Sequence, residues 1–210
     1  MPINEEPPLH PTAQKLVDTV IEMLQTTSYN NIKSENVLVR SGITRGPLYH
    51  HFEDFDDLIQ TAQIQLYKKF VLDVTSQLVN VLNSAEDLAT VQNKLKEFIN
   101  VRSEKIADNV LRQRIGIIHN AASHPTLREK LFESQETLTQ EWMKAYQICL
   151  DRGWADPTVD ARCVSILMQA TFIGRVLDGM SNVPMDLKEW QKVLIRLFDT
   201  FFFSGGSTSK

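Results

Sequence analysis

Apolar residues recur every three or four positions along most of this chain, which is the spacing of one face of an α-helix. The first clear stripe follows Pro11 and consists of Leu16, Val17, Val20, Ile21 and Leu24. No segment alternates apolar and polar residues as a half-buried strand would. The pattern therefore predicts an all-α fold of about nine helices.

Two short helices with a glycine turn between them are predicted from residue 34 to residue 52. Ser34 is suited to cap the first helix, and Gly42 ends it, because glycine enters the left-handed conformation without a Cβ clash. Thr44 is expected to cap the second helix. Leu48 and Phe52, four residues apart, anchor its buried side.

The remaining helix starts are predicted from capping residues. Asp54 with Asp57 begins a long helix that would reach roughly 40 Å, enough to start in one domain and end in another. Further starts are predicted at Ser84 with Asp87, at Pro125, at Asp156 with Pro157, and at Asp186 with Glu189, while Gly153 ends the helix before Asp156.

The second short helix leaves a set of polar side chains on its outer side. They are a hydroxyl, a cation and rings that carry hydrogen-bond donors, which are the groups that meet phosphates and base edges. The residues are Thr44, Arg45, Gly46, Tyr49, His50 and His51. This arrangement favours a DNA-binding function.

The run SGITRGPLYHHF, residues 41–52, resembles the helix-turn-helix of the TetR-type family of bacterial transcriptional regulators. That motif reads apolar, Gly, apolar, Ser/Thr, Lys/Arg, Gly, small, Leu, Tyr, aromatic or His, His, Phe. The resemblance implies an N-terminal three-helix DNA-binding domain joined by a long helix to a helical-bundle domain for ligand binding and dimerisation. The expected parts are a disordered arm (1–10), the helix-turn-helix domain (11–54), the effector-binding and dimerisation domain (55–203) and a flexible tail (204–210).

The resemblance also implies which residues contact double-stranded operator DNA. They are Lys33, Ser34, Thr44, Arg45, Gly46, Pro47, Tyr49, His50 and His51. Arg45 is expected to read a base edge, since a guanidinium binds guanine through two hydrogen bonds. Lys33 and Ser34 are expected to contact mainly phosphate, and Tyr49, His50 and His51 to position the DNA backbone. The alternatives are that Arg45 is a solvated surface cation and that the two histidines make no contact with DNA.

A homodimer is expected, because one such reading unit covers little DNA and two units about 34 to 36 Å apart match successive turns of the duplex. The last two helices would form the interface through Leu167, Phe172, Val176, Leu194, Phe198 and Phe202. The alternative is that these residues pack within one subunit.

A small-molecule effector is expected among the central helices. The candidate contacts are Phe98, Arg102, His119, Trp142, Tyr146, Met168 and Phe172, a mixture that favours a mainly apolar or aromatic ligand. The alternative for each is a core or surface role. Repression, with release of DNA when the effector binds, is the usual behaviour of the family.

Two departures from the family pattern concern charge. Phe55 stands where these regulators usually have a Lys, with Glu53, Asp54, Asp56 and Asp57 around it, and no Lys or Arg precedes Lys15. Because the net charge is -4, no overall positive field attracts nucleic acid. A ligand-binding or protein-interaction dimer with a degenerate reader is therefore the alternative function.

Other classes of protein are disfavoured by the residues present. Cys149 and Cys163 lie too far apart for a CxxC motif and favour a reducing, cytoplasmic compartment. His119 and His124, five residues apart, do not share a helix face, and the sequence has no glycine-rich phosphate loop or GxSxG motif. We therefore expect no enzyme, no metal and no cofactor, and no association with a membrane, since no run of 18 apolar residues occurs.

Overall fold

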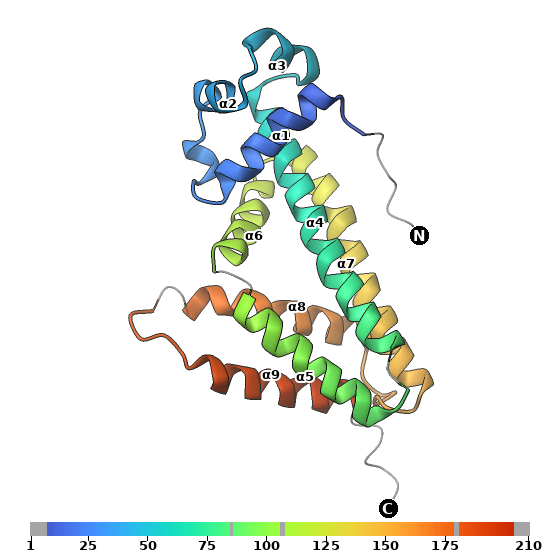
Figure 1. Ribbon diagram of the computed structural model, residues 1–210. Coiled ribbons are helices and arrows are strands. Elements are labelled where there is room, and N and C mark those ends of the chain that lie inside the picture. Colours follow the sequence, from blue (N-terminus) through green and yellow to red (C-terminus); the bar gives the residue numbers. More distant parts are fainter. Residues whose placement is uncertain (1–7, 85, 106–107, 179–180, 204–210) are drawn as a thin grey trace, which may run out of the picture. The chain divides into compact units, whose positions relative to one another are not determined.

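The computed structural model describes residues 8–84, 86–105, 108–178 and 181–203, and these ranges contain nine α-helices and no strand (Figure 1). The helices are α1 (Pro11–Leu24), α2 (Ser34–Ser41), α3 (Arg45–His51), α4 (Phe55–Asn83), α5 (Leu88–Lys105), α6 (Asp108–Ala121), α7 (Pro125–Asp151), α8 (Ala161–Asp178) and α9 (Leu187–Phe202), with a 3-10 turn at Tyr29–Asn31. The predicted all-α fold is confirmed. The predicted flexible tail and most of the predicted arm lie outside the described residues.

The chain folds into two compact units, each built from segments that are not contiguous in sequence. The first unit contains residues up to 70 and residues 112–134, and the second contains residues 71–111 and those from 135 onward. The long helix α4 contributes its first sixteen residues, 55–70, to the first unit. The functional boundary predicted after residue 54 stays a prediction.

The first unit has an apolar core built mainly by α1 and the start of α4. Its buried residues are Ala13, Leu16, Val17, Val20, Met23, Leu24, Ile32, Val37, Leu48, Phe52, Leu58, Ile59 and Ala62. Helix α1 contacts both α2 and α3, so the buried side of each short helix is covered. The stripe predicted after Pro11 is therefore the side of α1 that holds the unit together.

Helix α6 is joined to the rest of this unit by polar contacts. The Gln113 side chain donates to the Leu24 carbonyl at the end of α1 (2.7 Å), and the Asn120 amide donates to buried Gln63 on α4 (2.8 Å). Arg114, also buried, lies 4.5 Å from the centre of the Phe70 ring on α4. Since an amide pair or a guanidinium is costly to bury without partners, these contacts fix α6 against α1 and α4.

The second unit is centred on an aromatic cluster between α7 and α9. Trp142 lies 6.0 Å from Phe198 and 6.2 Å from Phe202, and Tyr146 meets Phe202 edge to face at 5.3 Å. The Tyr146 hydroxyl donates to the Asp156 carbonyl (2.9 Å), so its polar end is satisfied. Helix α9 also packs along α5.

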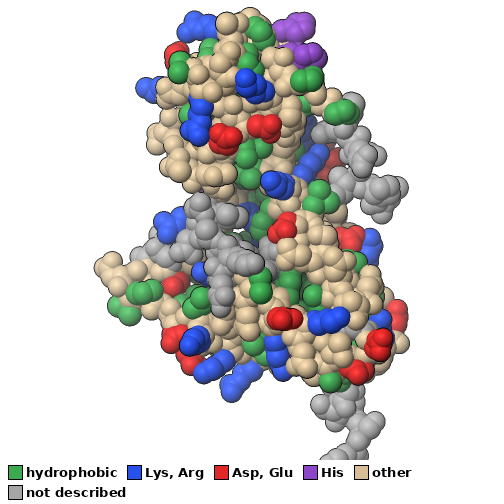
Figure 2. Space-filling model, viewed as in Figure 1, with side chains coloured by type: hydrophobic (Ala, Val, Ile, Leu, Met, Phe, Trp, Pro, Cys, Tyr) green, Lys and Arg blue, Asp and Glu red, His purple; other side chains and the backbone are tan. Residues whose placement is uncertain are grey.

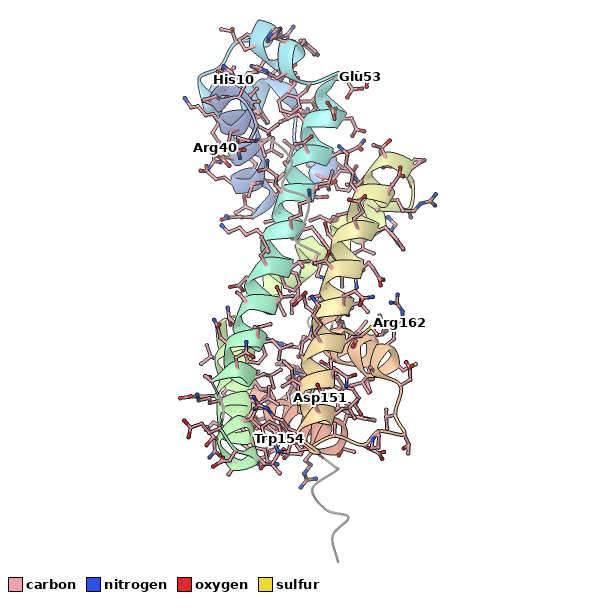
Figure 3. All side chains as sticks on the ribbon, turned by 90° about the vertical axis from the view of Figure 1, so that its right-hand side faces the viewer. His10, Arg40, Glu53, Asp151, Trp154 and Arg162 are labelled. Atoms are coloured by element: carbon pink, nitrogen blue, oxygen red, sulfur yellow. The ribbon has the colours of Figure 1, made fainter. Side chains whose placement is uncertain are left out.

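Helix α8 is tied to α7 by polar groups. Arg162 forms a two-pronged ion pair with Glu136 (2.8 and 2.7 Å), at the start of α8 in Figure 3. The carboxamide of buried Gln169 accepts from Gln135 (2.6 Å) and donates to Thr139 (3.2 Å). These bonds set the register between the two helices.

Two of the helix starts predicted after α3 are wrong. Helix α8 begins at Ala161, because Asp160 accepts from the Cys163 amide (2.8 Å), whereas Asp156 accepts from Thr158 in a separate turn. Ser84 donates back to the Asn80 carbonyl at the end of α4 (2.6 Å), and Asp87 caps α5 by itself, accepting from the Thr90 amide (2.7 Å). The starts at Asp54, Pro125 and Asp186 are confirmed.

Candidate nucleic-acid interface

The turn between α2 and α3 depends on the backbone of Gly42. This residue ends α2 with φ of 67°, the left-handed conformation that the sequence predicted. The Ser41 hydroxyl supports the turn, since it donates to the Leu38 carbonyl and accepts from the Ile43 amide, both at 3.3 Å. The chain can therefore change direction within three residues and begin α3.

Helix α3 is anchored on one side only. Leu48 is fully buried, and Phe52, which follows the helix, is 5% exposed. Thr44 is the cap residue of α3 in an extended conformation, but its side chain makes no capping hydrogen bond. Apolar burial, rather than side-chain capping, holds this short helix in place.

The opposite side of α3 faces solvent. Thr44, Arg45, Gly46, Tyr49 and His50 are all exposed, and we call them the recognition face; Pro47 and His51 are half-buried beside it. The exposure expected of the recognition face is confirmed, whereas its contact with DNA stays a prediction. Lys33 is exposed and occupies the cap position of α2, which the sequence analysis had assigned to Ser34. Ser34 is the first residue of the helix and is half-buried.

An acidic residue that the sequence analysis missed lies beside the recognition face. A Glu35 carboxylate oxygen on α2 is 3.5 Å from Nη2 of Arg45 on α3, and both side chains are exposed. The pKa of Glu35 is held below its ordinary value, chiefly by a backbone amide hydrogen bond, and further by Ser34 and the cations Arg45 and Lys33. The carboxylate is therefore ionised at neutral pH.

Three histidines meet at the end of α3. The His51 ring stacks on His10 with 4.8 Å between ring centres and meets His50 edge-on at 4.9 Å. Histidine side chains gather at the end of this unit in Figure 2. Burial, and then the charges of His10 and His50, lower the pKa of His51, so its neutral form is favoured. His10 also accepts from the Thr12 amide and so caps α1 (3.2 Å).

The acidic residues at the start of α4 serve the helix. Asp54 accepts from the Asp57 amide (2.8 Å), as predicted, and Asp57 accepts from the amide of Glu53, the residue before the cap (3.1 Å). Glu53 lies at the junction of α3 and α4 in Figure 3. Phe55 packs against the core of the first unit, which explains an apolar residue at this position.

The predicted effector contacts are distributed over both units. Trp142, Tyr146 and Met168 are fully buried and Phe98 nearly so in the second unit, whereas His119 is exposed in the first. The side chains of Arg102 and Phe172 lie outside the described residues. The effector contacts therefore stay a prediction.

Of the predicted dimer residues, Leu194, Phe198 and Phe202 are buried within the chain itself. Phe198 contacts Trp142, and Phe202 contacts Tyr146, within the same chain. The alternative, that these residues pack within one subunit, therefore holds for these three. Leu167 is 39% exposed and Val176 is half-buried. Side chains that are exposed and apolar on the last two helices include Ile166, Leu177 and Val193.

Over the residues that the structure describes, no three His, Cys, Asp or Glu side chains are grouped to hold a metal ion. Within the same residues, none of the helices combines the length and the apolar character needed to cross a membrane.

No protein-family model matches the chain, and a search of curated proteins found no match. Solved structures are similar over nearly the whole chain. One, described as a TetR-family transcriptional regulator from Mesorhizobium loti, is 16% identical with a TM-score of 0.69, over 90% of this chain and 93% of that one. The fatty acid degradation regulator FadR from Bacillus halodurans is 18% identical with a TM-score of 0.67, over 97% of this chain and 100% of that one.

A third similar structure is a transcriptional regulator from Saccharomonospora viridis in complex with choline. It is 12% identical with a TM-score of 0.69, over 89% of this chain and 94% of that one. Likeness at such low identity concerns the path of the backbone, and it agrees with the motif at residues 41–52. The chain therefore has the fold of TetR-family transcriptional regulators, the family that its helix-turn-helix sequence resembles.

Proposed function

We propose that this protein is a TetR-type, ligand-responsive transcriptional regulator that binds a pseudo-palindromic operator as a homodimer and acts as a repressor. The observation that carries the proposal is the recognition face: a helix anchored by Leu48 turns Thr44, Arg45 and Tyr49 to solvent directly after a left-handed glycine. A hydroxyl, a guanidinium and a phenol on one outward helix side suit phosphates and base edges.

The test is binding of the purified chain to duplex fragments from the promoter region of its own gene in a gel-shift assay at low salt. Arg45→Ala should abolish a retained band, because Arg45 is proposed to read a base. Arg128→Ala, which removes an exposed arginine from α7, is the matched control and should bind as the wild-type chain does. Equal binding by wild type and Arg45→Ala would contradict the proposed role of Arg45.

The dimer is proposed to form through the outward sides of α8 and α9. Ile166, Leu177 and Val193 are 47%, 72% and 55% exposed in the single chain, and a second subunit would cover this apolar surface. Light scattering should give twice the chain mass of 24.0 kDa. Leu177→Glu should shift the mass toward that of one chain, whereas Val183→Glu, an equally exposed change in the loop before α9, should not.

The effector is proposed to be a small, mainly apolar or aromatic molecule that releases the DNA. The aromatic side chains of the second unit support this chemistry, since Trp142 and Tyr146 would offer apolar surface to such a ligand if α7 and its neighbours separate. A thermal-shift screen with aromatic and aliphatic metabolites should identify it, and a compound that raises the melting temperature should also weaken the gel-shift band.

A dimer whose DNA reader is degenerate is the second candidate. The observation that favours it is the acidic surroundings of α3, where Glu35 pairs with Arg45 and Glu53 follows the helix. An unbiased selection from genomic DNA separates the two functions. Enrichment of a palindromic sequence supports the regulator. If no genomic fragment is enriched even at low salt, the result supports the degenerate reader.

A further inference from the structure

The ion pair between Glu35 and Arg45 places an acceptor beside a donor at the proposed DNA surface, and the following inference rests on the proposed function. The two charged atoms are 3.5 Å apart, and the side chains are 63% and 70% exposed. One comes from the first turn of α2 and the other from the first turn of α3. Glu35 therefore lies near the start of α2, and Arg45 lies at the start of α3, just after the Gly42 turn.

A carboxylate at such a surface restricts the DNA that can approach it. It carries only acceptors at neutral pH, so it repels phosphates and gains nothing from guanine O6, guanine N7 or thymine O4. The donors in the major groove are the amino groups of cytosine and adenine. Glu35 therefore favours DNA in which an amino group stands opposite it.

The neighbouring guanidinium decides between these two amino groups. In a G·C pair, the cytosine amino group donates to guanine O6, so the donor and the acceptor are roughly 2.9 Å apart. This spacing is close to that of the Glu35 and Arg45 atoms, and guanine N7 supplies the second acceptor that a guanidinium needs for two hydrogen bonds. In an A·T pair, thymine offers Arg45 one acceptor beside a methyl group.

We propose that Glu35 is a specificity-determining residue that reads one G·C base pair together with Arg45. Glu35 accepts from the cytosine amino group, and Arg45 donates to O6 and N7 of the paired guanine. The ion pair can persist in the complex, because a carboxylate has about four lone-pair sites and a guanidinium five N–H donors. In the unbound protein the same pair holds the Arg45 side chain in the orientation that it needs.

The experiment is an in vitro selection from a randomised duplex library with the full-length chain, followed by affinity measurements on single-base variants of the selected site. The wild-type chain should select a G·C pair at one position in each half-site. Glu35→Ala should reduce the preference for G·C over A·T at that position by between about 5- and 150-fold. Glu35→Gln should move it toward A·T, because a carboxamide pairs with adenine N6 and N7.

Glu22→Ala is the matched control. Glu22 forms an equally exposed ion pair with Arg40 in the same unit (3.3 Å), and its removal changes the net charge by the same amount. Both variants should therefore bind random-sequence DNA more tightly, whereas only Glu35→Ala should alter the base preference. Thermal melting of each variant checks that it is folded.

The outcomes separate the inference from the function on which it rests. A wild-type chain that enriches no sequence overturns the proposed function. A wild-type chain that enriches a site without a fixed G·C pair in each half, or a Glu35→Ala chain with an unchanged base preference, overturns only the role of Glu35. A change of preference as large in Glu22→Ala would assign the effect to charge alone and would overturn it too.

Discussion

Replacing Gly46 by Ala should make the protein more stable and a weaker DNA binder. Gly46 lies in the first turn of α3 and is exposed. Apart from its chain neighbours and the backbone of its own helix, no atom of the described residues lies within 4 Å of the place where a Cβ would stand. Its backbone is helical, without the positive φ that Gly42 requires. The added methyl group therefore meets nothing in the unbound protein.

The size of the stability gain follows from these facts. Alanine is favoured over glycine in a helix by roughly 0.5–1 kcal/mol, because its unfolded chain has fewer conformations to lose. A position in the first turn takes the lower part of this range, about 0.5 kcal/mol. For a chain of this size the melting temperature should rise by about 1–2 °C, as calorimetry can measure.

The loss of DNA affinity has a different origin. If the start of α3 lies against base edges, a methyl group there pushes the helix away from the groove and lengthens the hydrogen bonds of Arg45. The loss of one two-pronged base contact weakens binding by about fivefold or more. Fluorescence anisotropy with a labelled operator measures this change.

Gly116→Ala provides the control. Gly116 lies within α6, and a Cβ there would also meet no atom within 4 Å. Its substitution should raise the melting temperature by at least as much, because Gly116 is in the helix interior, and should leave DNA affinity unchanged. The reasoning is refuted if Gly46→Ala binds the operator as tightly as the wild type, because the backbone of α3 would then not approach the duplex. A lowered melting temperature of Gly46→Ala would contradict the statement that the structure has room for a methyl group at position 46.

Three further predictions concern stability. Phe198→Ala should lower the free energy of unfolding by about 3–5 kcal/mol in urea titrations, because this fully buried ring contacts Trp142 and Phe202 and leaves a cavity. The Arg162 hydrogen bonds lower the pKa of Glu136 to about 2, so the stabilising effect of the Glu136 carboxylate is present above the ordinary carboxyl pKa and is lost as the pH falls toward 2. The Glu136→Gln variant should therefore lose less stability than the wild type between about pH 5 and pH 3. Equal losses of stability would contradict this. Gly42→Ala should cost about 1–2 kcal/mol, and Gly42→Asn less, because asparagine adopts the left-handed conformation more readily; thermal melts that rank them in the opposite order would count against strain at the turn.

Local sequence patterns predicted the helices and the turn before α3. The spacing of apolar residues after Pro11 places the buried side of α1 correctly, and Gly42 adopts the conformation expected of it. Both are properties of neighbouring residues, which interact within one or two turns of helix. The exposed side of α3 follows in the same way once Leu48 is assigned to the core.

Other features depend on contacts between distant parts of the chain. Glu35 is ten residues from Arg45, and His10 is forty-one residues from His51, so no periodicity connects them before the fold is known. Helix α8 had two acidic residues that could cap it, Asp156 and Asp160, and the chain uses the later one.

The discontinuous make-up of the first unit has a consequence for how the protein forms during translation. The chain leaves the ribosome from its N-terminus, so α1, α2 and α3 emerge long before residues 112–134. Until Gln113 and Asn120 have been synthesised, the Leu24 carbonyl and the Gln63 side chain lack the hydrogen-bond donors that α6 supplies. The first unit therefore reaches its final packing only after all of α5 and most of α6 have been made, and a fragment that stops at residue 54 would lack Leu58, Ile59 and Ala62 from the core of this unit.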